Sequence, residues 1–359
     1  MSDRAGLKVL FLDSWHTDRS RGSGSAVAIQ GLASGIEALG HSVTFLRPRW
    51  RLPAPAGGRI LANVGFRARA RRHDADLVIG FDFDGFLTAP DVTPYVVCLK
   101  GVMADEARYE TGWSRIRHLS LARLERWNAR RAARVLVTSQ HSRRVAIAAY
   151  GLDPEITRVV PEGISVSDWQ DRTFGGLPAD RPPVILSVAR QYRRKNTSTL
   201  IRAMIGVLRE VPDARLRVVG DGPEMGRLEQ LVRSLGLADS VTFLGALEGV
   251  DAVRDEMARA RVFCLPSRQE GFGIVFLEAM AAGLPIVAAR CGAVPETAPH
   301  GEVALLVDPD DVEELASALV RILRDADLST RLARGGNDRW LRFDWSAIAE
   351  RFLAEVGRS

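Results

Sequence analysis

The segment Ser267–Glu278 carries the strongest chemical signal in the sequence. Two glutamates, Glu270 and Glu278, flank a glycine-containing run that follows a predicted strand ending at Leu265 and leads into a helix predicted from Ile274. The free N–H groups of such a loop and helix start form an anion site. Glu278 lies one turn into the helix and leans back towards its start. Its carboxylate suits hydrogen bonds to sugar or ribose hydroxyls, or it simply stabilises the helix dipole.

Two cations, Arg190 and Lys195, follow the strand predicted over 184–188. Cations five residues apart on a strand-end loop can flank a diphosphate and offset the negative charge that develops as it leaves. The alternative is an exposed basic turn, because Arg193 and Arg194 lie directly beside them. Lys195 is one of only three lysines in the chain, which favours a specific role.

Two other motifs invite functional interpretations that we do not favour. Asp82 and Asp84 could hold Mg²⁺ or Mn²⁺ against a diphosphate, but the sequence offers no third ligand, so we predict no metal site. Gly24 opens a predicted helix without the spacing of a dinucleotide fingerprint, which argues against hydride transfer. A glycine there still lets a ligand approach the backbone closely.

Short apolar strands alternate with helical stretches along the whole chain. Strands are predicted over 7–12, 43–46, 77–79, 95–99, 135–137, 184–188, 216–219, 241–244, 262–265 and 286–288. Helices are predicted over 26–39, 197–210, 224–235, 274–282 and 311–324. Strands that are short, apolar and followed by helices indicate parallel sheets covered on both faces.

The chain of 359 residues exceeds the size of one ordinary core, so we predict two α/β domains. Proline and glycine cluster between Pro161 and Pro183. We therefore place an N-terminal domain at 1–170, a linker at 171–183 and a C-terminal domain at 184–342. In such sheets the ligand site lies at the carboxyl ends of the strands.

The composition, 46% hydrophobic and 26% charged, excludes a disordered chain. The longest nearly apolar stretch, Gly273–Ala289, is interrupted by Glu278 and falls short of a membrane span. The first residues run straight into a strand and do not predict a signal peptide. Three cysteines without paired spacing indicate a reduced, cytoplasmic protein.

Positive charge is concentrated in the first half. Residues 1–170 hold 24 Lys+Arg and 17 Asp+Glu, whereas the remainder holds 25 and 27. This balance predicts a polyanionic or membrane-surface partner for the first domain. The stretch Arg67–Arg72 is either a solvated helix face or a weak peripheral membrane contact. Almost every cation is arginine and no nucleic-acid-binding motif is present, so we predict no nucleic-acid partner.

Several motifs together resemble a known family. Glu270, seven intervening residues and Glu278, followed by Ala279–Ala288, resemble the E-x7-E signature of glycosyltransferase family 4. Further motifs follow in the family's order: Gly24 with Gly40-His41, Pro161–Ile164, Arg190 and Lys195, Val219–Glu224, Pro266-Ser267, Gly292–Glu296 and Phe343–Trp345. The resemblance covers nearly the whole chain. It implies the GT-B fold, with two Rossmann-like doubly wound parallel-sheet domains facing a central cleft and a C-terminal helix, 343–359, packing back on the first domain.

The resemblance implies a retaining hexosyltransferase (EC 2.4 class) of carbohydrate biosynthesis, cytoplasmic or peripheral at the inner face of the cell membrane. Such an enzyme moves a hexose-type sugar from a UDP- or GDP-sugar to a hydroxyl of a small-molecule, glycan or lipid-linked acceptor. The nucleotide sugar is a co-substrate, and the family usually works without a metal or other cofactor. As catalytic residues, Arg190 and Lys195 hold the diphosphate and Glu270 contacts the donor sugar. Glu278 binds the ribose.

The remaining donor-binding positions implied by the resemblance are Gly24, Leu247, Gly273, Ile274 and Val275. The chain departs from the family at Lys100, where a histidine is often found. A lysine can donate to a sugar hydroxyl on the donor-sugar or acceptor side, but it cannot act as a neutral imidazole.

Three other functions fit the same scaffold. A nucleotide-sugar epimerase and a sugar phosphorylase share the two-domain architecture. A non-catalytic nucleotide-sugar-binding protein would keep the fold and lose the chemistry. The presence of Glu270, Glu278, Arg190 and Lys195 favours catalysis.

Overall fold

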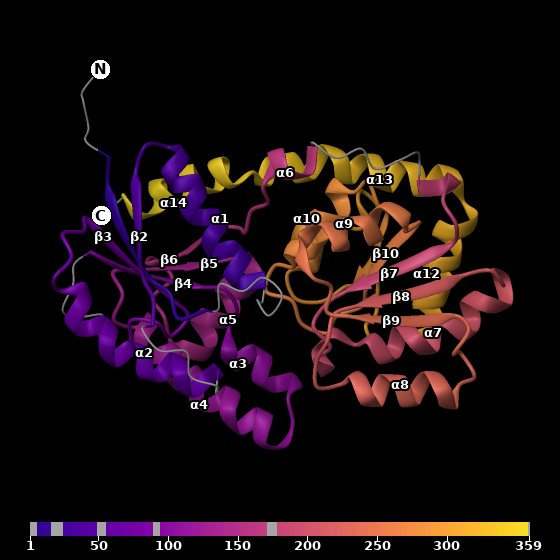
Figure 1. Cartoon of the computed structure of the whole chain (residues 1–359), viewed down its shortest axis with the longest axis horizontal. Coiled ribbons are helices and arrows are strands. Elements are labelled where there is room, and N and C mark those ends of the chain that lie inside the picture. Colours follow the sequence, from indigo (N-terminus) through magenta and orange to yellow (C-terminus); the bar gives the residue numbers. More distant parts are fainter. Residues whose placement is uncertain (1–5, 16–23, 49–54, 89–93, 171–177, 358–359) are drawn as a thin grey trace. The chain divides into compact units, whose positions relative to one another are not determined.

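The computed structural model describes residues 6–15, 24–48, 55–88, 94–170 and 178–357. The chain divides into two compact units (Figure 1). Among the described residues, unit 1 contains 6–15, 24–163 and 344–357, and unit 2 contains 164–343.

Unit 1 is a parallel sheet between two layers of helices. Its described strands pair in the order β2-β1-β3-β4-β5-β6. Along the chain its elements are β1 (Lys8–Leu12), α1 (Gly24–Ala38), β2 (Ser42–Leu46), α2 (Pro55–Ala70), β3 (Leu77–Phe81), β4 (Tyr95–Leu99), α3 (Met103–Glu106), α4 (Gly112–Ala129), β5 (Arg134–Val137), α5 (Gln140–Tyr150), β6 (Thr157–Val159) and α14 (Trp345–Val356).

The strands of unit 1 bury both of their faces. Leu10 and Leu12 of β1 belong to a core that contains residues of α2, α4 and α5. Because side chains alternate along a strand, the neighbouring Val9 and Phe11 are buried on the opposite face. The C-terminal helix α14 packs against α1, so the end of the chain completes the first unit.

Unit 2 repeats the arrangement with the strand order β12-β11-β10-β7-β8-β9. Its elements are α6 (Val166–Gln170), β7 (Val184–Val188), α7 (Thr197–Glu210), β8 (Arg215–Val219), α8 (Met225–Ser234), β9 (Val241–Gly245), α9 (Gly249–Arg259), β10 (Val262–Leu265), α10 (Ile274–Ala281), β11 (Ile286–Ala289), α11 (Val294–Thr297), β12 (Ala304–Val307), α12 (Val312–Arg324) and α13 (Ala326–Trp340).

Two cores lie on the two faces of the unit 2 sheet. One contains residues of α7, α8, α12 and α13. The other contains residues of α6, α9 and α10. The alternation of strand and helix predicted from the sequence is therefore confirmed as a parallel α/β architecture in both units.

The structure also contains elements that the sequence patterns did not predict: β6, β12, α9 and α13. Helix α13 includes Gly335 and Gly336, which lower its helical propensity. A Cβ atom at Gly335 would lie 2.1 Å from the carbonyl oxygen of Glu302, so close packing requires glycine there. Strands β6 and β12 lie at sheet edges and are only three and four residues long.

The compact units meet in the chain at 163/164, ahead of the predicted boundary at 170/171. Trp169 of α6 is buried in a core of unit 2. Arg181, which lies in the segment predicted to be a linker, donates hydrogen bonds to the carbonyl groups of Met257 and Ala260 in the same unit. Residues 171–177 of that segment lie outside the described residues.

The contact between α1 and α14 leaves no room for a side chain at Gly35. A Cβ atom there would lie 2.3 Å from the carbonyl oxygen of Trp345. We expect Gly35→Ala to lower the thermal unfolding midpoint, because forced overpacking costs about 1–3 kcal/mol. Gly65→Ala is the matched control, since that position in α2 has open space around it. It should leave the midpoint unchanged or raise it. Equal midpoints for the two variants would show that the α1–α14 contact is loose.

Candidate active site

The strand order of unit 2 reverses between β7 and β10. From β7 the chain builds the sheet outward through β8 and β9, then returns to add β10 on the other side of β7. In an open parallel sheet, the carboxyl ends of the strands at such a reversal flank the binding crevice. The loops after β7 and β10 hold the predicted residues Arg190, Lys195 and Glu270.

The loop after β7 is fixed by buried polar contacts. Asn196 takes a left-handed conformation (φ 59°), and its amide donates to the carbonyl oxygens of Pro266 (3.1 Å) and Pro309 (2.6 Å). The Thr197 hydroxyl donates to the Gln191 side chain at 2.7 Å. These bonds tie the β7 loop to the segment that follows β10, so the short helix carrying Lys195 has a defined position.

Lys195 and Glu270 form the centre of the site. Lys195 Nζ donates to Glu270 Oε1 at 2.6 Å, and the Ser267 hydroxyl donates to the same oxygen at 2.8 Å. The side chains of Lys195 and Glu270 are 15% and 8% exposed, so both charges are largely removed from water. A partly buried charge-assisted hydrogen bond of this kind holds both side chains in one geometry.

The backbone of Glu270 is held by the segment after β11. Its carbonyl oxygen accepts from the Ala293 N–H at 3.0 Å. The neighbouring Gly292 has a positive φ of 58°, and a Cβ atom there would lie 2.5 Å from the same carbonyl oxygen. A glycine is therefore required for this approach. Gly273, with φ 84°, is the N-cap residue directly before α10.

Glu278 lies within α10, and the structure gives it no hydrogen-bond partner among the described residues. Burial raises its pKa from 4.5 to about 7, and the charge of Arg254 opposes this shift. The side chain is partly buried, and a carboxylate that loses water without gaining a hydrogen-bond partner is costly for stability. It is suited to accepting hydrogen bonds from a ligand that enters the site.

The other predicted residues of unit 2 lie on the loop after β7, on the segment after β9 and in the first turn of α10. Arg190 is exposed, its guanidinium lies 5.6 Å from the Tyr192 ring, and no ion pair is seen for it within the described residues. Leu247, Ile274 and Val275 are partly buried and pack against the core beside α10. Arg190 shares the loop of Lys195, and without an ion pair to any described residue its positive charge is available for a diphosphate.

Unit 1 has its own strand reversal, between β1 and β3. Asp84, after β3, accepts hydrogen bonds from the backbone (2.9 Å) and hydroxyl (2.6 Å) of Ser14, after β1. Arg59 of α2 lies 3.6 Å from Asp82 and 3.5 Å from Asp84. It also stacks over the rings of Trp15 and Phe83. This reversal is therefore filled by protein groups, and the sequence patterns did not single out Arg59.

The Asp82 side chain accepts a hydrogen bond from the backbone of unit 1. The residue takes a positive φ of 58°, and one of its oxygens accepts from the Lys100 N–H at 2.9 Å. Burial raises its pKa to about 6, while the charge of Arg59 opposes that shift. Within the described residues there is no group of three histidine, cysteine or acidic side chains that could hold a metal ion. The Asp82–Asp84 pair faces an arginine.

Lys100 is also committed to a partner within unit 1. Its ammonium group lies 3.0 Å from Glu162, and the two side chains are only 7% and 5% exposed. Both residues line a small cavity of about 20 Å³ together with Thr138 and Trp345. Glu162 lies in the Pro161–Ile164 motif, but nothing in the spacing links it to Lys100. Gly24 is the first residue of α1 and is exposed, and the residues before it, 16–23, lie outside the described part of the chain.

Two family models match the chain in succession. Residues 22–168 match the model described as Glycosyltransferase Family 4, and residues 170–339 match Glycosyl transferases group 1. Among solved structures, sucrose-phosphate synthase from Thermosynechococcus elongatus has a TM-score of 0.80 at 23% identity, with 98% of both chains covered. HepE of Anabaena, in complex with UDP and glucose, has a TM-score of 0.75 at 22% identity, covering 98% of this chain and all of that one.

Curated relatives are similar over part of their length. A GDP-mannose-dependent phosphatidylinositol monomannoside mannosyltransferase of Mycobacterium tuberculosis is 36% identical over 45% of this chain and 44% of its own length. An MMP alpha-(1->4)-mannosyltransferase of Mycolicibacterium hassiacum is 34% identical over 63% of this chain and 54% of its own. A D-inositol 3-phosphate glycosyltransferase of Corynebacterium kroppenstedtii is 32% identical over 63% and 53%. The chain thus spans about half the length of these relatives.

The two parallel-sheet units, with their solved structural neighbours, define a protein of the GT-B fold, as the sequence predicted. With both family models matched in order, the chain belongs to glycosyltransferase family 4.

The raised pKa of Glu278 makes stability depend on pH. The folded chain keeps this proton up to about pH 7, whereas the unfolded chain releases it near 4.5, so the contribution of Glu278 to stability falls as pH rises through that window. Glu278→Gln has no charge to bury. We expect the unfolding midpoint of Glu278→Gln minus that of wild type to be larger at pH 8 than at pH 5. Glu229→Gln, at an exposed position of α8, is the control and should follow wild type at both pH values. Parallel pH profiles for wild type and Glu278→Gln would show that this carboxylate is already well solvated.

Proposed function

We propose that this chain transfers a hexose-type sugar from a nucleotide diphosphate sugar to an acceptor hydroxyl, with retention of the anomeric configuration and without a metal ion. The observation that carries the proposal is the Lys195–Glu270 pair at the strand reversal of unit 2. It lies on the loops where a parallel sheet binds its ligand.

The charges around this pair fit a departing nucleotide diphosphate. Lys195 uses one of its three N–H donors on Glu270, so two remain for phosphate oxygens. Arg190 supplies a second cation on the same loop. These fixed positive groups stabilise the charge that develops on the leaving diphosphate, which is the task a metal ion performs in other transferases.

Glu270 and Glu278 take different parts of the donor. Glu270, held by Lys195 and Ser267, contacts hydroxyls of the transferred sugar, while Glu278 binds the ribose. In a retaining transfer the leaving phosphate oxygen accepts the proton of the acceptor hydroxyl, so the reaction needs no dedicated protein base. Leu247 and the N–H groups of Gly273, Ile274 and Val275 complete the donor site in unit 2, and Gly24 of unit 1 is a further proposed donor-binding residue.

The names of the relatives indicate which nucleotide sugar to test first as the donor. Two of those described above are named as mannosyltransferases, and one of these is named as GDP-mannose-dependent. We therefore propose GDP-mannose as the first donor to test, ahead of UDP-glucose. The names of two of these relatives include phosphatidylinositol monomannoside and D-inositol 3-phosphate, which supports a small-molecule or lipid-linked acceptor; a glycan acceptor, and a location in the cytoplasm or at the inner face of the cell membrane, remain part of the proposal.

Incubation with labelled GDP-mannose or UDP-glucose separates this proposal from its alternatives. Transfer to an acceptor, or slow release of free sugar, identifies a transferase. Conversion of the labelled sugar into its epimer identifies an epimerase, and phosphate-dependent release of sugar phosphate identifies a phosphorylase. Binding without turnover of either donor would leave a nucleotide-sugar-binding protein.

Chelation tests the metal-free chemistry. If Lys195 and Arg190 neutralise the diphosphate, turnover should be nearly unchanged by excess EDTA, because no step depends on a bound cation. Initial rates with and without EDTA, and after adding back Mg²⁺ or Mn²⁺, measure this directly. A rate abolished by EDTA and restored by one of those metals would overturn the proposed charge stabilisation.

Substitution of Glu270 and of Glu278 should have different effects on turnover and on nucleotide affinity. Glu270→Gln removes a negative charge beside the anomeric carbon, so kcat should fall at least about tenfold. Affinity for the free nucleotide diphosphate should not fall, because Lys195 keeps its charge and loses a competing carboxylate. Glu278→Gln loses charge-assisted hydrogen bonds to the ribose, worth about 1.5–3 kcal/mol, so that affinity should weaken roughly 10- to 100-fold.

Calorimetry with GDP and UDP, run beside steady-state rates, distinguishes the two outcomes. Glu229→Gln is again the control and should match wild type in both measurements. Equal losses of nucleotide affinity in Glu270→Gln and Glu278→Gln would show that the proposed division of roles is wrong. Unchanged turnover in Glu270→Gln would remove the support for the transferase reaction itself.

A further inference from the structure

A cavity of about 300 Å³ opens in unit 2 beside the loop that carries Lys195. Its walls come from this loop, from the first turns of α7 and α8, and from the segment that follows β10. Arg190, Lys195, Glu270 and Glu278, whose side chains are proposed to bind the donor, do not line it. The proposed transfer reaction therefore leaves this cavity without a role.

The cavity and the proposed donor site share the β7 loop, but different helices complete them. Helices α7 and α8 contribute to the core on one face of the unit 2 sheet. Helix α10, whose first turn belongs to the proposed donor site, contributes to the core on the other face. A ligand in the cavity would therefore contact α7 and α8, and a ligand in the donor site would contact α10.

Positive charge predominates among the residues that line the cavity. They include four arginines and one acidic residue: Arg193, Arg202, Arg227, Arg268 and Glu224. Arg227 lies 3.3 Å from Glu224, and Arg268 donates a hydrogen bond to Asp310 at 2.9 Å. Within the part of the chain that the structure describes, neither Arg193 nor Arg202 forms an ion pair. These two guanidinium groups are available to an anion that enters the cavity.

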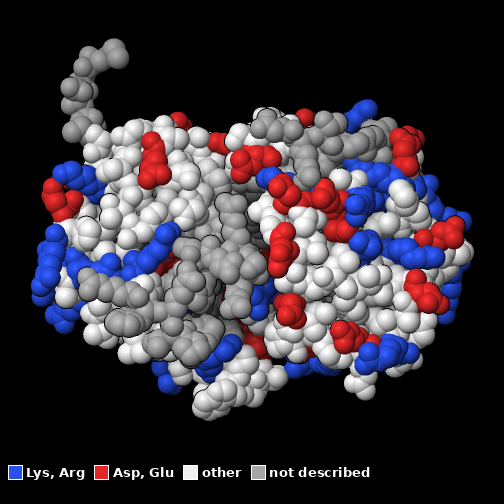
Figure 2. Space-filling view, in the orientation of Figure 1, with Lys and Arg blue, Asp and Glu red and all other residues white. Residues whose placement is uncertain are grey.

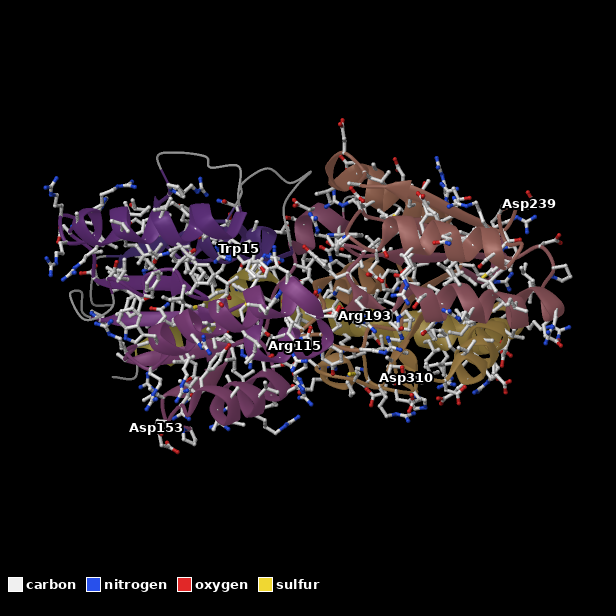
Figure 3. All side chains as sticks on the ribbon, turned by 90° about the horizontal axis from the view of Figure 1, so that it is seen from below. Trp15, Arg115, Asp153, Arg193, Asp239 and Asp310 are labelled. Carbon is white, nitrogen blue, oxygen red and sulfur yellow. The ribbon has the colours of Figure 1, made fainter. Side chains whose placement is uncertain are left out.

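This excess of arginine is a local feature of the surface. Figure 2 shows acidic and basic side chains interspersed over the visible face of unit 2. Figure 3 labels Arg193 and Asp310, which follow β7 and β12 and so mark the carboxyl end of the unit 2 sheet. Arg193, Arg202 and Arg227 are exposed, so a ligand from solvent can reach them.

The start of α7 adds backbone donors to the wall of the cavity. Asn196 directly precedes this 14-residue helix, but its side chain makes no capping hydrogen bond. Its amide donates to the carbonyl oxygens of Pro266 and Pro309, and its oxygen accepts from the Thr199 hydroxyl at 2.8 Å. The first N–H groups of α7 are therefore not capped by Asn196, and the positive end of the helix dipole adds to the charge of the arginines.

The size and the polar lining of the cavity indicate the kind of anion that fits. A volume of about 300 Å³ lies at the lower end of the range for small-molecule sites, so a small ligand fits and a macromolecular segment does not. Arginines bind phosphate through paired N–H groups, and a phosphate monoester carries nearly two negative charges at neutral pH. Tyr192 and Ser198 add hydroxyl groups to the walls, which can exchange hydrogen bonds with the hydroxyls of a sugar.

We infer that this cavity binds a hexose phosphate, as a second ligand besides the nucleotide sugar. Arg193 and Arg202 hold the phosphate group together with the first N–H groups of α7, and Tyr192 and Ser198 contact the sugar. The sequence showed Arg193 only as a neighbour of the predicted diphosphate cations. The structure separates the two, because Lys195 pairs with Glu270 whereas Arg193 lines the cavity.

Calorimetry with glucose 6-phosphate tests this inference without any sugar donor. Wild type should bind glucose 6-phosphate, and it should bind glucose and inorganic phosphate at least about tenfold more weakly, because each supplies only part of the contacts. The double variant Arg193→Gln/Arg202→Gln should also bind glucose 6-phosphate at least about tenfold more weakly than wild type.

The matched control is Arg209→Gln/Arg233→Gln. It removes the same charge from exposed positions in the last turns of α7 and α8, outside the cavity. This control should bind glucose 6-phosphate as wild type does. Both double variants should keep the unfolding midpoint of wild type, because all four side chains are exposed.

A second titration, with GDP or UDP at saturation, separates the cavity from the donor site. Glucose 6-phosphate should still bind there, because the two ligands use different side chains. Complete displacement by the nucleotide would assign the sugar phosphate to the donor site and overturn the inference. So would the absence of binding to wild type, or equal losses of affinity in the two double variants. Affinity for inorganic phosphate equal to that for glucose 6-phosphate would overturn the assignment to a hexose phosphate.

Discussion

The hydrogen-bonded ion pair between Lys195 and Glu270 joins the two loops that meet at the strand reversal of unit 2. Burying two charges costs free energy, and their attraction offsets it only when the geometry is well fixed. The surrounding contacts supply that geometry: Asn196 anchors the β7 loop, Ser267 shares the Glu270 oxygen, and Gly292 lets a neighbouring segment hold the Glu270 backbone. The pair is therefore set before any ligand arrives, which is what electrostatic stabilisation of a departing group requires.

Each unit has a strand reversal in its sheet, but the charged groups at the two reversals differ in whether the protein pairs them. At the reversal in unit 1, Asp84 is bonded to Ser14 and Asn63, and Arg59 lies against both Asp82 and Asp84. At the reversal in unit 2, Glu278 has no hydrogen-bond partner within the described residues, and Arg190 has no counter-ion there. The carboxylates of unit 1 are neutralised by Arg59, whereas the partly buried Glu278 and the exposed Arg190 keep hydrogen-bonding capacity that a ligand can use. This contrast supports a donor site in unit 2.

The sequence predicted the parts of this structure that depend on local pattern. Apolar runs located most strands to within a residue or two, since a buried parallel strand is apolar throughout. The sequence patterns did not predict the short edge strands β6 and β12 or the glycine-containing helix α13. These elements are stabilised by tertiary contacts, which local pattern does not reveal. In the site, the spacing of Glu270 and Glu278 indicated two carboxylates near one helix start. It could not show that Glu270 is paired with a lysine 75 residues away, or that Glu278 has no hydrogen-bond partner in the described part of the chain. The Lys100–Glu162 and Arg59–Asp84 contacts are also long-range.

Net charge alone could not show what the basic half of the chain does. Arg59 lies inside unit 1, where two aspartates offset its charge. Other arginines of α2 and α4, such as Arg115 and Arg123, are exposed to solvent. Both kinds add equally to the count of positive charges, yet Arg59 satisfies a buried network and the exposed arginines lie in water. Position in the fold, more than composition, therefore separates arginines that serve the buried structure from those on the surface.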